Sequence, residues 1–309
     1  MLDGRVGLGV IPGAGWGSSD IKDIAREAEA AGFDAIFAAE VNNDVLATAQ
    51  LMGSATGSIR VGTWIANIFL RHSYVCAQAA ALIADITEGR FILGLGVSHQ
   101  PVNGALGIEM RDPPTAAVRY AAEVKSWLRG EGPATHLPQS PASHPVPVYI
   151  AALTSTTVEN ASTVADGVMP LFWSPERAAK SKTWIERGRK NAADVTDTEL
   201  TLGLPTFIGD DRDSLYDAAR QNLGLYTTFP FFQHLFRVMG FEPEADEMKN
   251  GANGAALSNR LLDAVCLIGS VDECQERLTQ YRNAGVDLPI LMPPIGVEGA
   301  RSVITAFAS

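Results

Sequence analysis

The sequence is poor in cysteine and in positive charge. It has three cysteines among 309 residues, and none of them forms a CxxC pair, so a disulfide framework and a structural zinc site are not expected. Cys76, Cys266 and Cys274 are expected to be buried or half-buried thiols. The 24 Lys and Arg against 35 Asp and Glu leave a net charge of −11. An acidic surface repels phosphate backbones, which argues against a nucleic-acid partner.

Long hydrophobic runs are also missing. The N-terminus has no basic start followed by a long apolar stretch, so no signal peptide is expected. The most apolar uncharged run near the middle, Val61 to Leu70, is too short to cross a bilayer. These features favour a cytoplasmic protein without a membrane partner.

Motifs of common hydrolases do not occur in the sequence. It contains neither GxSxG nor HExxH. At the ends of the predicted strands only Glu40, Asp44 and His99 approach a set of metal ligands. We therefore predict no metal site, and a metal-dependent barrel hydrolase is the least favoured of four functional classes.

Apolar runs alternate with helical patterns along the whole chain, which is typical of a parallel sheet because each parallel strand needs a crossover. A helix is predicted over Ser19 to Ala31, with Gly32 in the left-handed conformation that ends it. A similar joint precedes the last strand at Gly285. Eight strands are predicted, at Arg5 to Ile11, Asp34 to Ala39, Ile59 to Ala66, Phe91 to Leu95, Pro147 to Ala152, Val168 to Leu171, Leu200 to Phe207 and Leu288 to Met292.

Eight parallel strands fit a closed barrel or a doubly wound open sheet. The open sheet would carry a phosphate-binding loop after the first strand. Gly7 to Gly13 suggests such a loop, but its third glycine is misplaced and Pro12 interrupts it. The closed barrel is therefore the preferred prediction.

Two intervals are longer than a loop and a helix, and we predict insertions there, after strands four and seven. The first runs from Pro101 to Pro145 and holds a helix near Thr115 to Leu128. The second, Gly209 to Asp263, is predicted to be mainly helical and is rich in aromatic residues. Insertions after barrel strands lie at the catalytic mouth. These aromatic residues form an apolar pocket wall or pack the insertion onto the barrel, and the sequence leaves both open.

The segment Asp85 to Val97, DITEGRFILGLGV, resembles the fourth-strand signature of luciferase-like monooxygenases and their deazaflavin-dependent relatives. Weaker resemblances follow in the same order as in that family: Gly62 to His72, Tyr149 to Thr154, and Leu267 to Ser270 together with Val286 to Pro293. Within that family, these motifs are most similar to those of the subgroup that uses coenzyme F420.

The resemblance implies a single-domain (β/α)8 TIM barrel over residues 1–309, with the helical insertion at about 209–263. It also implies coenzyme F420, or alternatively FMN, at the carboxyl ends of the strands, and a non-prolyl cis peptide at Trp64-Ile65 beneath the ring. A core aromatic is the other interpretation of Trp64. The cofactor's phosphate would meet small residues and a helix start, for which a plain helix cap is the alternative. The expected cofactor-binding residues are Trp64, Ile65, Asn67, Gly96, Val97, Ser98, Asn103, Ala151, Ala152, Leu153 and Thr154.

The candidate proton donors are Glu40, His72 and His99. Many deazaflavin relatives have an Asp-His pair where this chain has Glu40 and Val41, so the family histidine is missing. His99 is attractive because an unperturbed imidazole titrates near neutral pH. His72 follows Arg71, and the pair is predicted to touch the substrate or a phosphate. The alternative is the start of a helix in solvent.

The leading hypothesis is an F420-dependent oxidoreductase that transfers a hydride to or from an organic substrate. The alternatives are an FMN-dependent luciferase-like monooxygenase and, in another class, a non-catalytic flavin-binding barrel. The aromatic insertion favours an apolar small-molecule substrate. Exposed apolar helices would allow a homodimer.

Overall fold

Strands and helices alternate along the chain in the computed structural model, which describes residues 4–132, 137–192 and 197–308. Eight strands of these residues pair in parallel in the order β1–β2–β3–β5–β6–β7–β8–β10. The pairing of β10 with β1 closes the ring, so the open-sheet alternative is wrong and the predicted barrel is confirmed. The barrel strands are β1 (Gly7–Val10), β2 (Ala35–Ala38), β3 (Arg60–Thr63), β5 (Phe91–Gly96), β6 (Val148–Ile150), β7 (Gly167–Val168), β8 (Glu199–Ile208) and β10 (Leu288–Met292).

Each of these strands overlaps one of the eight predicted runs, and two short strands accompany them. β4 (Ala66–Asn67) continues the third run after a break and pairs with β5. β9 (Leu267–Gly269) pairs with the end of β8, beyond the part of β8 that pairs with β10. β8 is therefore shared between the barrel and the insertion that follows it.

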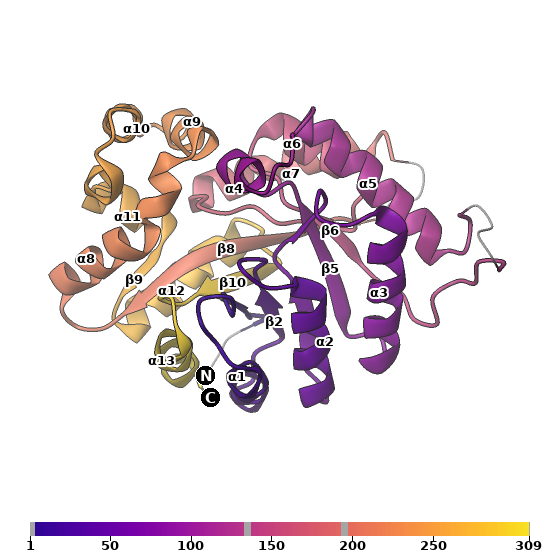
Figure 1. Cartoon of the computed structure of the whole chain (residues 1–309). Coiled ribbons are helices and arrows are strands. Elements are labelled where there is room, and N and C mark those ends of the chain that lie inside the picture. Colours follow the sequence, from indigo (N-terminus) through magenta and orange to yellow (C-terminus); the bar gives the residue numbers. More distant parts are fainter. Residues whose placement is uncertain (1–3, 133–136, 193–196, 309) are drawn as a thin grey trace.

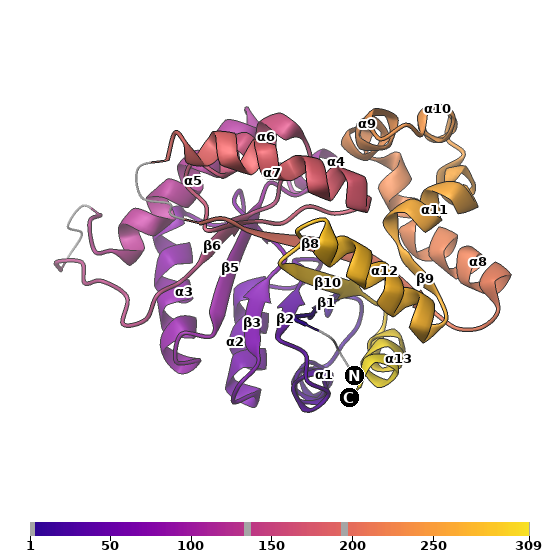
Figure 2. The ribbon, with the colours of Figure 1, turned by 180° about the vertical axis from the view of Figure 1, so that it is seen from behind.

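Helices surround the barrel, as Figures 1 and 2 show from opposite sides. The helix predicted over 19–31 spans 18–30, and the helix predicted near 115–128 spans 113–128, so both are confirmed. The surrounding helices are α1 (Ser18–Ala30), α2 (Val45–Ala55), α3 (Ser73–Ile86), α5 (Pro113–Leu128), α6 (Ser155–Ala161), α7 (Pro175–Arg189), α12 (Val271–Asn283) and α13 (Val297–Phe307).

Both insertions lie where they were predicted, after β5 and after β8. The first begins with α4 (Gln100–Ala105). The second is mainly helical and forms a lobe beside the barrel, orange in Figures 1 and 2, in which α9 lies next to α4. Its elements are α8 (Arg212–Leu223), η1 (Gly224–Thr228), α9 (Pro230–Val238), α10 (Glu242–Lys249), η2 (Asn253–Ala256) and α11 (Asn259–Val265).

The two similar joints in the sequence have the same structure. Gly32 and Gly285 have φ of +84° and +94°, the left-handed region that glycine tolerates best. The aspartate two residues after each glycine accepts a backbone N–H from the neighbouring strand: Asp34 from Val6 at 2.9 Å and Asp287 from Leu200 at 2.8 Å. The joint thus ends a helix and sets the register of the next strand.

Two hydrophobic layers hold the fold together. The larger one lies between the strands and the helices and includes Cys76, Cys266 and Cys274, which are free buried thiols as predicted. The smaller one fills the inside of the barrel with side chains such as Phe37, Tyr149 and Ile290. Because strands covered on both faces need apolar residues throughout, β1, β2 and β5 are buried along their whole length.

Candidate active site

The exits of the third, fourth and fifth barrel strands meet at one end of the barrel. Leu95 of β5 pairs with Ala66 of β4 on one side and Ile150 of β6 on the other. A Cβ atom added to Gly96 would lie 2.6 Å from Cγ1 of Ile65 and 3.3 Å from Cβ of Ala151. A side chain at position 96 would collide with Ile65, so a glycine here lets three predicted residues, Ile65, Gly96 and Ala151, meet at the exits of neighbouring strands.

Trp64 forms the floor of this mouth. Its half-buried indole packs on the cluster inside the barrel. A Cβ on Gly203 would lie 2.2 Å from Cζ2 of the indole, and one on Gly9 would lie 2.8 Å from Cζ3. Glycines on β1 and β8 therefore make room for the ring, as expected of a core aromatic. The Trp64-Ile65 peptide is cis, as predicted.

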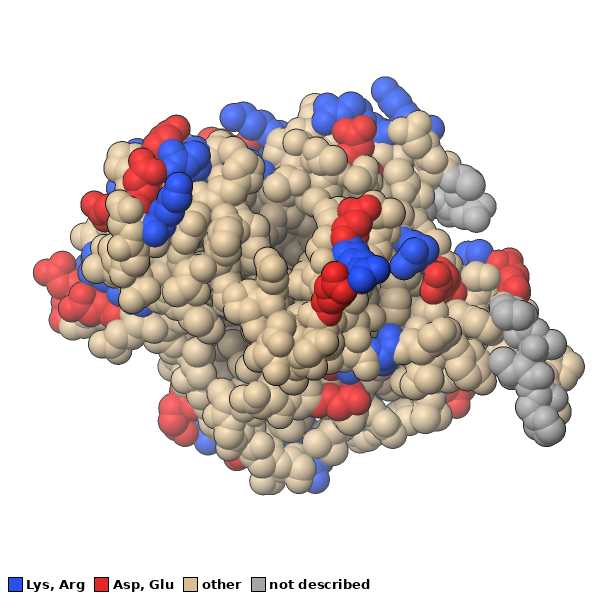
Figure 3. Space-filling view, turned by 45° about the horizontal axis from the view of Figure 1, so that its top comes forward, with Lys and Arg blue, Asp and Glu red and all other residues tan. Residues whose placement is uncertain are grey.

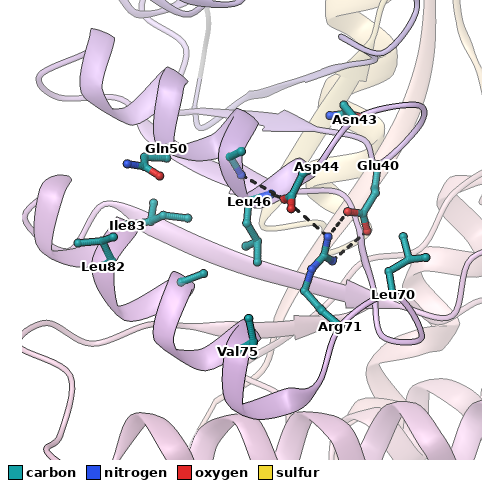
Figure 4. A pocket seen from close by; sticks show the side chains of 12 residues that line it. Glu40, Asn43, Asp44, Leu46, Gln50, Leu70, Arg71, Val75, Leu82 and Ile83 are labelled. Carbon is teal, nitrogen blue, oxygen red and sulfur yellow. Dashed lines mark hydrogen bonds and ion pairs between the residues drawn. The ribbon is translucent and has the colours of Figure 1, made fainter.

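Glu40 lies at the exit of β2 in a saturated polar network (Figure 4). Its carboxylate pairs with Arg71 through two hydrogen bonds and also accepts the backbone N–H groups of Asn67 at 2.7 Å and Val45 at 3.3 Å. The side chains of Glu40 and Arg71 are only 5% and 11% exposed. Arg71, which the sequence offered to substrate or phosphate, is thus engaged within the protein. The role of Glu40 as a proton donor stays a prediction.

Asn67 and Asn103 are buried and bind each other. Nδ2 of Asn67 donates to Oδ1 of Asn103 at 2.7 Å, and Nδ2 of Asn103 donates to the carbonyl of Val97 at 2.8 Å. The Asn67 Oδ1 atom accepts the N–H of Phe69 at 3.1 Å. These amides tie β4 and α4 to the exit of β5. Whether they also contact a cofactor stays a prediction.

His99 follows Val97 and Ser98 in the loop after β5, where Ser98 has a left-handed φ of +55°. The imidazole stacks on Phe229 and Phe231 of the insertion, with ring centroids 4.2 Å and 5.2 Å away. Its Nδ1 atom is buried and has no hydrogen-bond partner. Burial lowers the pKa of His99 from 6.5 to about 4, below the neutral range of an unperturbed imidazole. Its role as a proton donor stays a prediction. At neutral pH the imidazole is uncharged, with an unused nitrogen.

The loop after β6 is occupied by helix capping. Thr154 is the N-cap of α6, and its hydroxyl accepts the N–H of Thr157. The Thr157 Oγ1 atom accepts the N–H groups of Thr154 at 2.9 Å and Leu153 at 3.2 Å. Ala151 donates its N–H to the carbonyl of Leu95 at 2.8 Å, while Ala152 is buried. The N–H groups of Ala151, Leu153 and Thr154 are thus used within the protein. Whether this loop also holds a cofactor's phosphate stays a prediction.

His72 is exposed and stands apart from the buried groups of the mouth. It is the N-cap of α3, and its Nδ1 atom accepts the N–H of Tyr74 at 3.1 Å. This arrangement agrees with the interpretation of His72 as a helix start in solvent. A contact with substrate stays a prediction.

The aromatic residues of the insertion both pack it onto the barrel and form an apolar surface, the two possibilities that the sequence left open. Phe172, at the exit of β7, makes edge contacts with Tyr226, Phe232 and Phe236, which pack the insertion onto the barrel. Phe231 remains 37% exposed beside His99. The insertion is thus an apolar wall next to the mouth. Figure 3 shows hollows in this end of the molecule, bordered mainly by uncharged residues.

Arg177, in the first turn of α7, was not predicted to lie near the mouth. Its Nη2 atom donates to the carbonyl of Leu153 at 2.7 Å. The same carbonyl accepts Nε1 of Trp173 at 3.2 Å. No motif in the sequence signals this contact, because α7 follows a different strand from the loop that it touches.

Neither a metal-ligand set nor a membrane span is found in the described part of the chain. No group of three His, Cys, Asp or Glu side chains within 4–132, 137–192 and 197–308 could hold a metal ion. Over the same residues, no helix combines the length and the apolar character that crossing a membrane requires.

Comparisons with known proteins extend over almost the whole chain. The sequence is 28% identical to a Mycobacterium tuberculosis protein named “Putative coenzyme F420-dependent oxidoreductase Rv3520c”, over 87% of this chain and 89% of that protein. It is 24% identical to the 5,10-methylenetetrahydromethanopterin reductase of Methanolobus tindarius, over 92% and 93% of the two chains. The fold matches the coenzyme F420-dependent tetrahydromethanopterin reductase of Methanopyrus kandleri with a TM-score of 0.81 and 19% identity, over 99% and 98% of the chains.

The family itself is settled by a sequence model. The model described as luciferase-like monooxygenase matches residues 5–288, which is most of the chain. The resemblance drawn from the fourth-strand segment is therefore confirmed. The protein belongs to the luciferase-like monooxygenase family.

Proposed function

We propose that the protein is an F420-dependent oxidoreductase that transfers a hydride between the deazaflavin and an organic substrate. The observation that carries the proposal is that the two curated relatives above, whose names refer to an F420-dependent oxidoreductase and a methylenetetrahydromethanopterin reductase, align over about nine-tenths of both chains. A solved structure of similar fold is an F420-dependent secondary alcohol dehydrogenase, with a TM-score of 0.77 and 16% identity.

The residues at the mouth fit a flat ring. Trp64 and Ile65 supply an apolar floor, and Gly96 and Ala151 leave little side-chain volume around it. His99 stands beside the aromatic wall with a buried nitrogen that lacks a partner. A bound cofactor supplies the hydride chemistry, so the protein has to position the ring, exclude water and provide polar contacts.

His99 is the residue that we assign to the reacting polar atom of the substrate. Its neutral imidazole can donate one hydrogen bond and accept another. Since Nδ1 has no partner in the protein, a bound oxygen or nitrogen atom would satisfy it without breaking an existing bond. The stacked Phe229 and Phe231 rings fix the plane of the imidazole. These rings also favour an apolar substrate body next to the polar atom.

Titration of the purified protein with oxidised F420 and with FMN tests the cofactor assignment. We expect micromolar binding of F420, detected by quenching of tryptophan fluorescence, and much weaker binding of FMN. Micromolar affinity for FMN with none for F420 would instead establish the monooxygenase alternative. That alternative draws support from a flavin monooxygenase from Pseudomonas putida, solved with FMN, whose fold matches with a TM-score of 0.68 and 14% identity. Binding of either cofactor without turnover of any substrate would favour the non-catalytic barrel.

We also propose that the chain forms a homodimer through α2 and α3. A groove of about 520 Å³ runs between these helices, and Figure 4 shows its apolar side chains, among them Leu46 and Ile83. Leu70, Val75 and Leu82 line it and are exposed. Contiguous exposed apolar surface of this kind marks interaction sites. Sedimentation should show a dimer that Val75→Glu dissociates and Val238→Glu, on α9, does not; a monomeric wild-type protein would refute the proposal.

Two expectations from the sequence stay proposals. One is the organisation of residues 1–309 as a single domain that carries the insertion at 209–263. The other is a cytoplasmic location.

A further inference from the structure

The imidazole of His99 is held by aromatic rings and not by hydrogen bonds. Its Nδ1 atom is buried without a partner, and no hydrogen bond joins either ring nitrogen to the described part of the chain. The ring of Phe229 stacks on it, with centroids 4.2 Å apart and planes 18° apart. A histidine at a functional site is ordinarily oriented by a hydrogen bond to its second nitrogen. In this site a phenylalanine takes the place of that partner.

Phe229 is also the ring that shields the imidazole from water. It is 3% exposed, whereas Phe231, the second stacked ring, lies 5.2 Å away and is 37% exposed. The titratable groups on η1 and α9, the elements that supply these rings, are Tyr226, His234 and Arg237. None of them contributes to the lowered pKa of His99, whose cause is burial.

Phe229 is in turn anchored at the exit of another barrel strand. It makes an edge contact with Tyr226 of η1, which makes an edge contact with Phe172 after β7, with centroid distances of 6.4 Å and 5.0 Å. Phe172, Tyr226, Phe229 and His99 thus form an aromatic bridge from the exit of β7 to the loop after β5. Phe172 is 2% exposed and has a left-handed φ of +58°. A bulky residue keeps this unfavourable conformation only where its surroundings hold it, and such strain points to a function.

We propose that Phe229 is a positioning residue, through which the insertion holds the imidazole of His99 in one plane and shields it from water. The inference rests on the proposed function in taking His99 as the group that meets the reacting polar atom of the substrate. It adds that the reactivity of His99 depends on how the insertion after β8 packs onto the barrel.

The test compares Phe229→Ala with Phe229→Tyr and with Phe241→Ala. Alanine removes the ring from the imidazole, and tyrosine keeps it. Phe241 is another buried phenylalanine of the insertion, 7% exposed, so its removal should lower stability to a similar extent. Its ring packs against the guanidinium of Arg260, 4.4 Å away, and makes no ring contact with the described residues of the aromatic bridge.

The first measurement is an NMR titration of the histidine ring protons in the protein without cofactor. The signal of His99 is identified by its absence from the spectrum of His99→Leu. We expect a pKa near 4 in the wild type, in Phe229→Tyr and in Phe241→Ala. In Phe229→Ala water reaches the imidazole, and the pKa should rise toward 6.5.

The second measurement is steady-state kinetics with F420 and a substrate found by screening. The pH at which kcat/KM changes reports groups of the free enzyme, and in Phe229→Ala it should move in parallel from about 4 toward 6.5. We expect kcat at neutral pH to fall about tenfold in Phe229→Ala because the plane of the imidazole is lost. Phe229→Tyr should restore kcat, and Phe241→Ala should leave it unchanged.

The inference is overturned if Phe229→Ala leaves the pKa of His99 at its wild-type value, or if Phe241→Ala raises that pKa equally. If Phe229→Ala does not fold, Phe229→Leu takes its place, because leucine is apolar and lacks a planar ring. Its pKa should rise less while kcat still falls about tenfold, and a wild-type kcat would count against a role of the ring.

The NMR titration keeps this test separate from the proposed function, since it needs no cofactor. If the pKa of His99 depends on Phe229 but F420 supports no turnover, the shielding by Phe229 stands and the F420 assignment fails. If F420 supports turnover but neither the pKa nor the pH profile responds to Phe229→Ala, the proposed function stands and the positioning role fails.

Discussion

Two sides of the barrel mouth differ in whether their buried polar groups have hydrogen-bond partners. On the side of β2 and β4, Glu40 accepts four hydrogen bonds, and Asn67 donates to Asn103 of α4. On the side of β5 and β6, a nitrogen of His99 and another of Arg177 are buried without partners. Unmade hydrogen bonds in a protein interior are costly, and a ligand bound at the mouth would complete these two. We therefore assign a structural role to the polar groups of the first side, the saturated side, and a ligand-binding role to those of the second, the unsaturated side.

The largest expected effect is on the saturated side, from Glu40→Gln. This change leaves the guanidinium of Arg71 buried without its main counter-charge, since Asp44 lies 3.6 Å away and is largely exposed. We expect the free energy of unfolding in urea at neutral pH to fall by about 3 kcal/mol. The control is Glu109→Gln, which breaks an exposed pair with Arg111 and should cost less than about 1 kcal/mol. Equal losses in the two variants would remove the distinction between the sides.

On the unsaturated side, His99→Leu should affect catalysis more than folding. The substitution removes a buried nitrogen that has no partner, so the free energy of unfolding at neutral pH should stay the same or rise. Turnover of a substrate found by screening with reduced or oxidised F420 should fall about 100-fold. Phe231→Leu serves as the control, because it alters the stacked wall and leaves the imidazole in place. Loss of stability without loss of turnover would assign His99 to the structural side.

The pH dependence of the free energy of unfolding tests the burial of His99 on the unsaturated side. The folded pKa of His99 is about 4, below the ordinary 6.5, so the unfolded chain binds this proton first as the pH falls. The folded protein therefore pays no protonation penalty at His99 above about pH 6.5, and its stability falls as the pH drops toward 4. Between about pH 7 and pH 5 the wild type should lose about 2 kcal/mol more than His99→Leu. Parallel urea-unfolding curves for the two proteins over that range would contradict the burial of His99.

The smallest effect is expected at His72, which lies outside both sets of buried groups. His72→Ala removes the side chain that caps α3, and the free energy of unfolding should fall by about 0.5 kcal/mol. Steady-state kinetics of the same variant separate the two interpretations of this residue. A loss of turnover greater than about tenfold would assign it the catalytic role that the sequence suggested.

The sequence predicted the barrel because its evidence is local and repeated. Apolar runs, helix periodicity and the glycine joints at Gly32 and Gly285 each depend on a few neighbouring residues. The short strand β9 was not predicted, because it exists only as a partner for the end of β8. Pairing between distant segments leaves no mark of its own in a sequence.

The candidate site was predicted less completely, for the same reason. Gly96 and Ala151 were predicted to bind the cofactor at the exits of β5 and β6, and the structure brings them together beside Ile65. Their contact with a cofactor stays a prediction. The lowered pKa of His99 was not predicted, because phenylalanines some 130 residues away in the chain bury it. Arg177 went unnoticed because its unpaired state depends on which carboxylates the fold brings near it.

Hydrogen exchange of the backbone amides, with and without oxidised F420, tests the assignment of binding to the unsaturated side most directly. We expect slower exchange at residues 96–99, 151–154 and 229–232 when F420 is present, and unchanged exchange in α2 and α3. Protection confined to α2 and α3, or none at residues 96–99 and 151–154 with F420 bound, would contradict it.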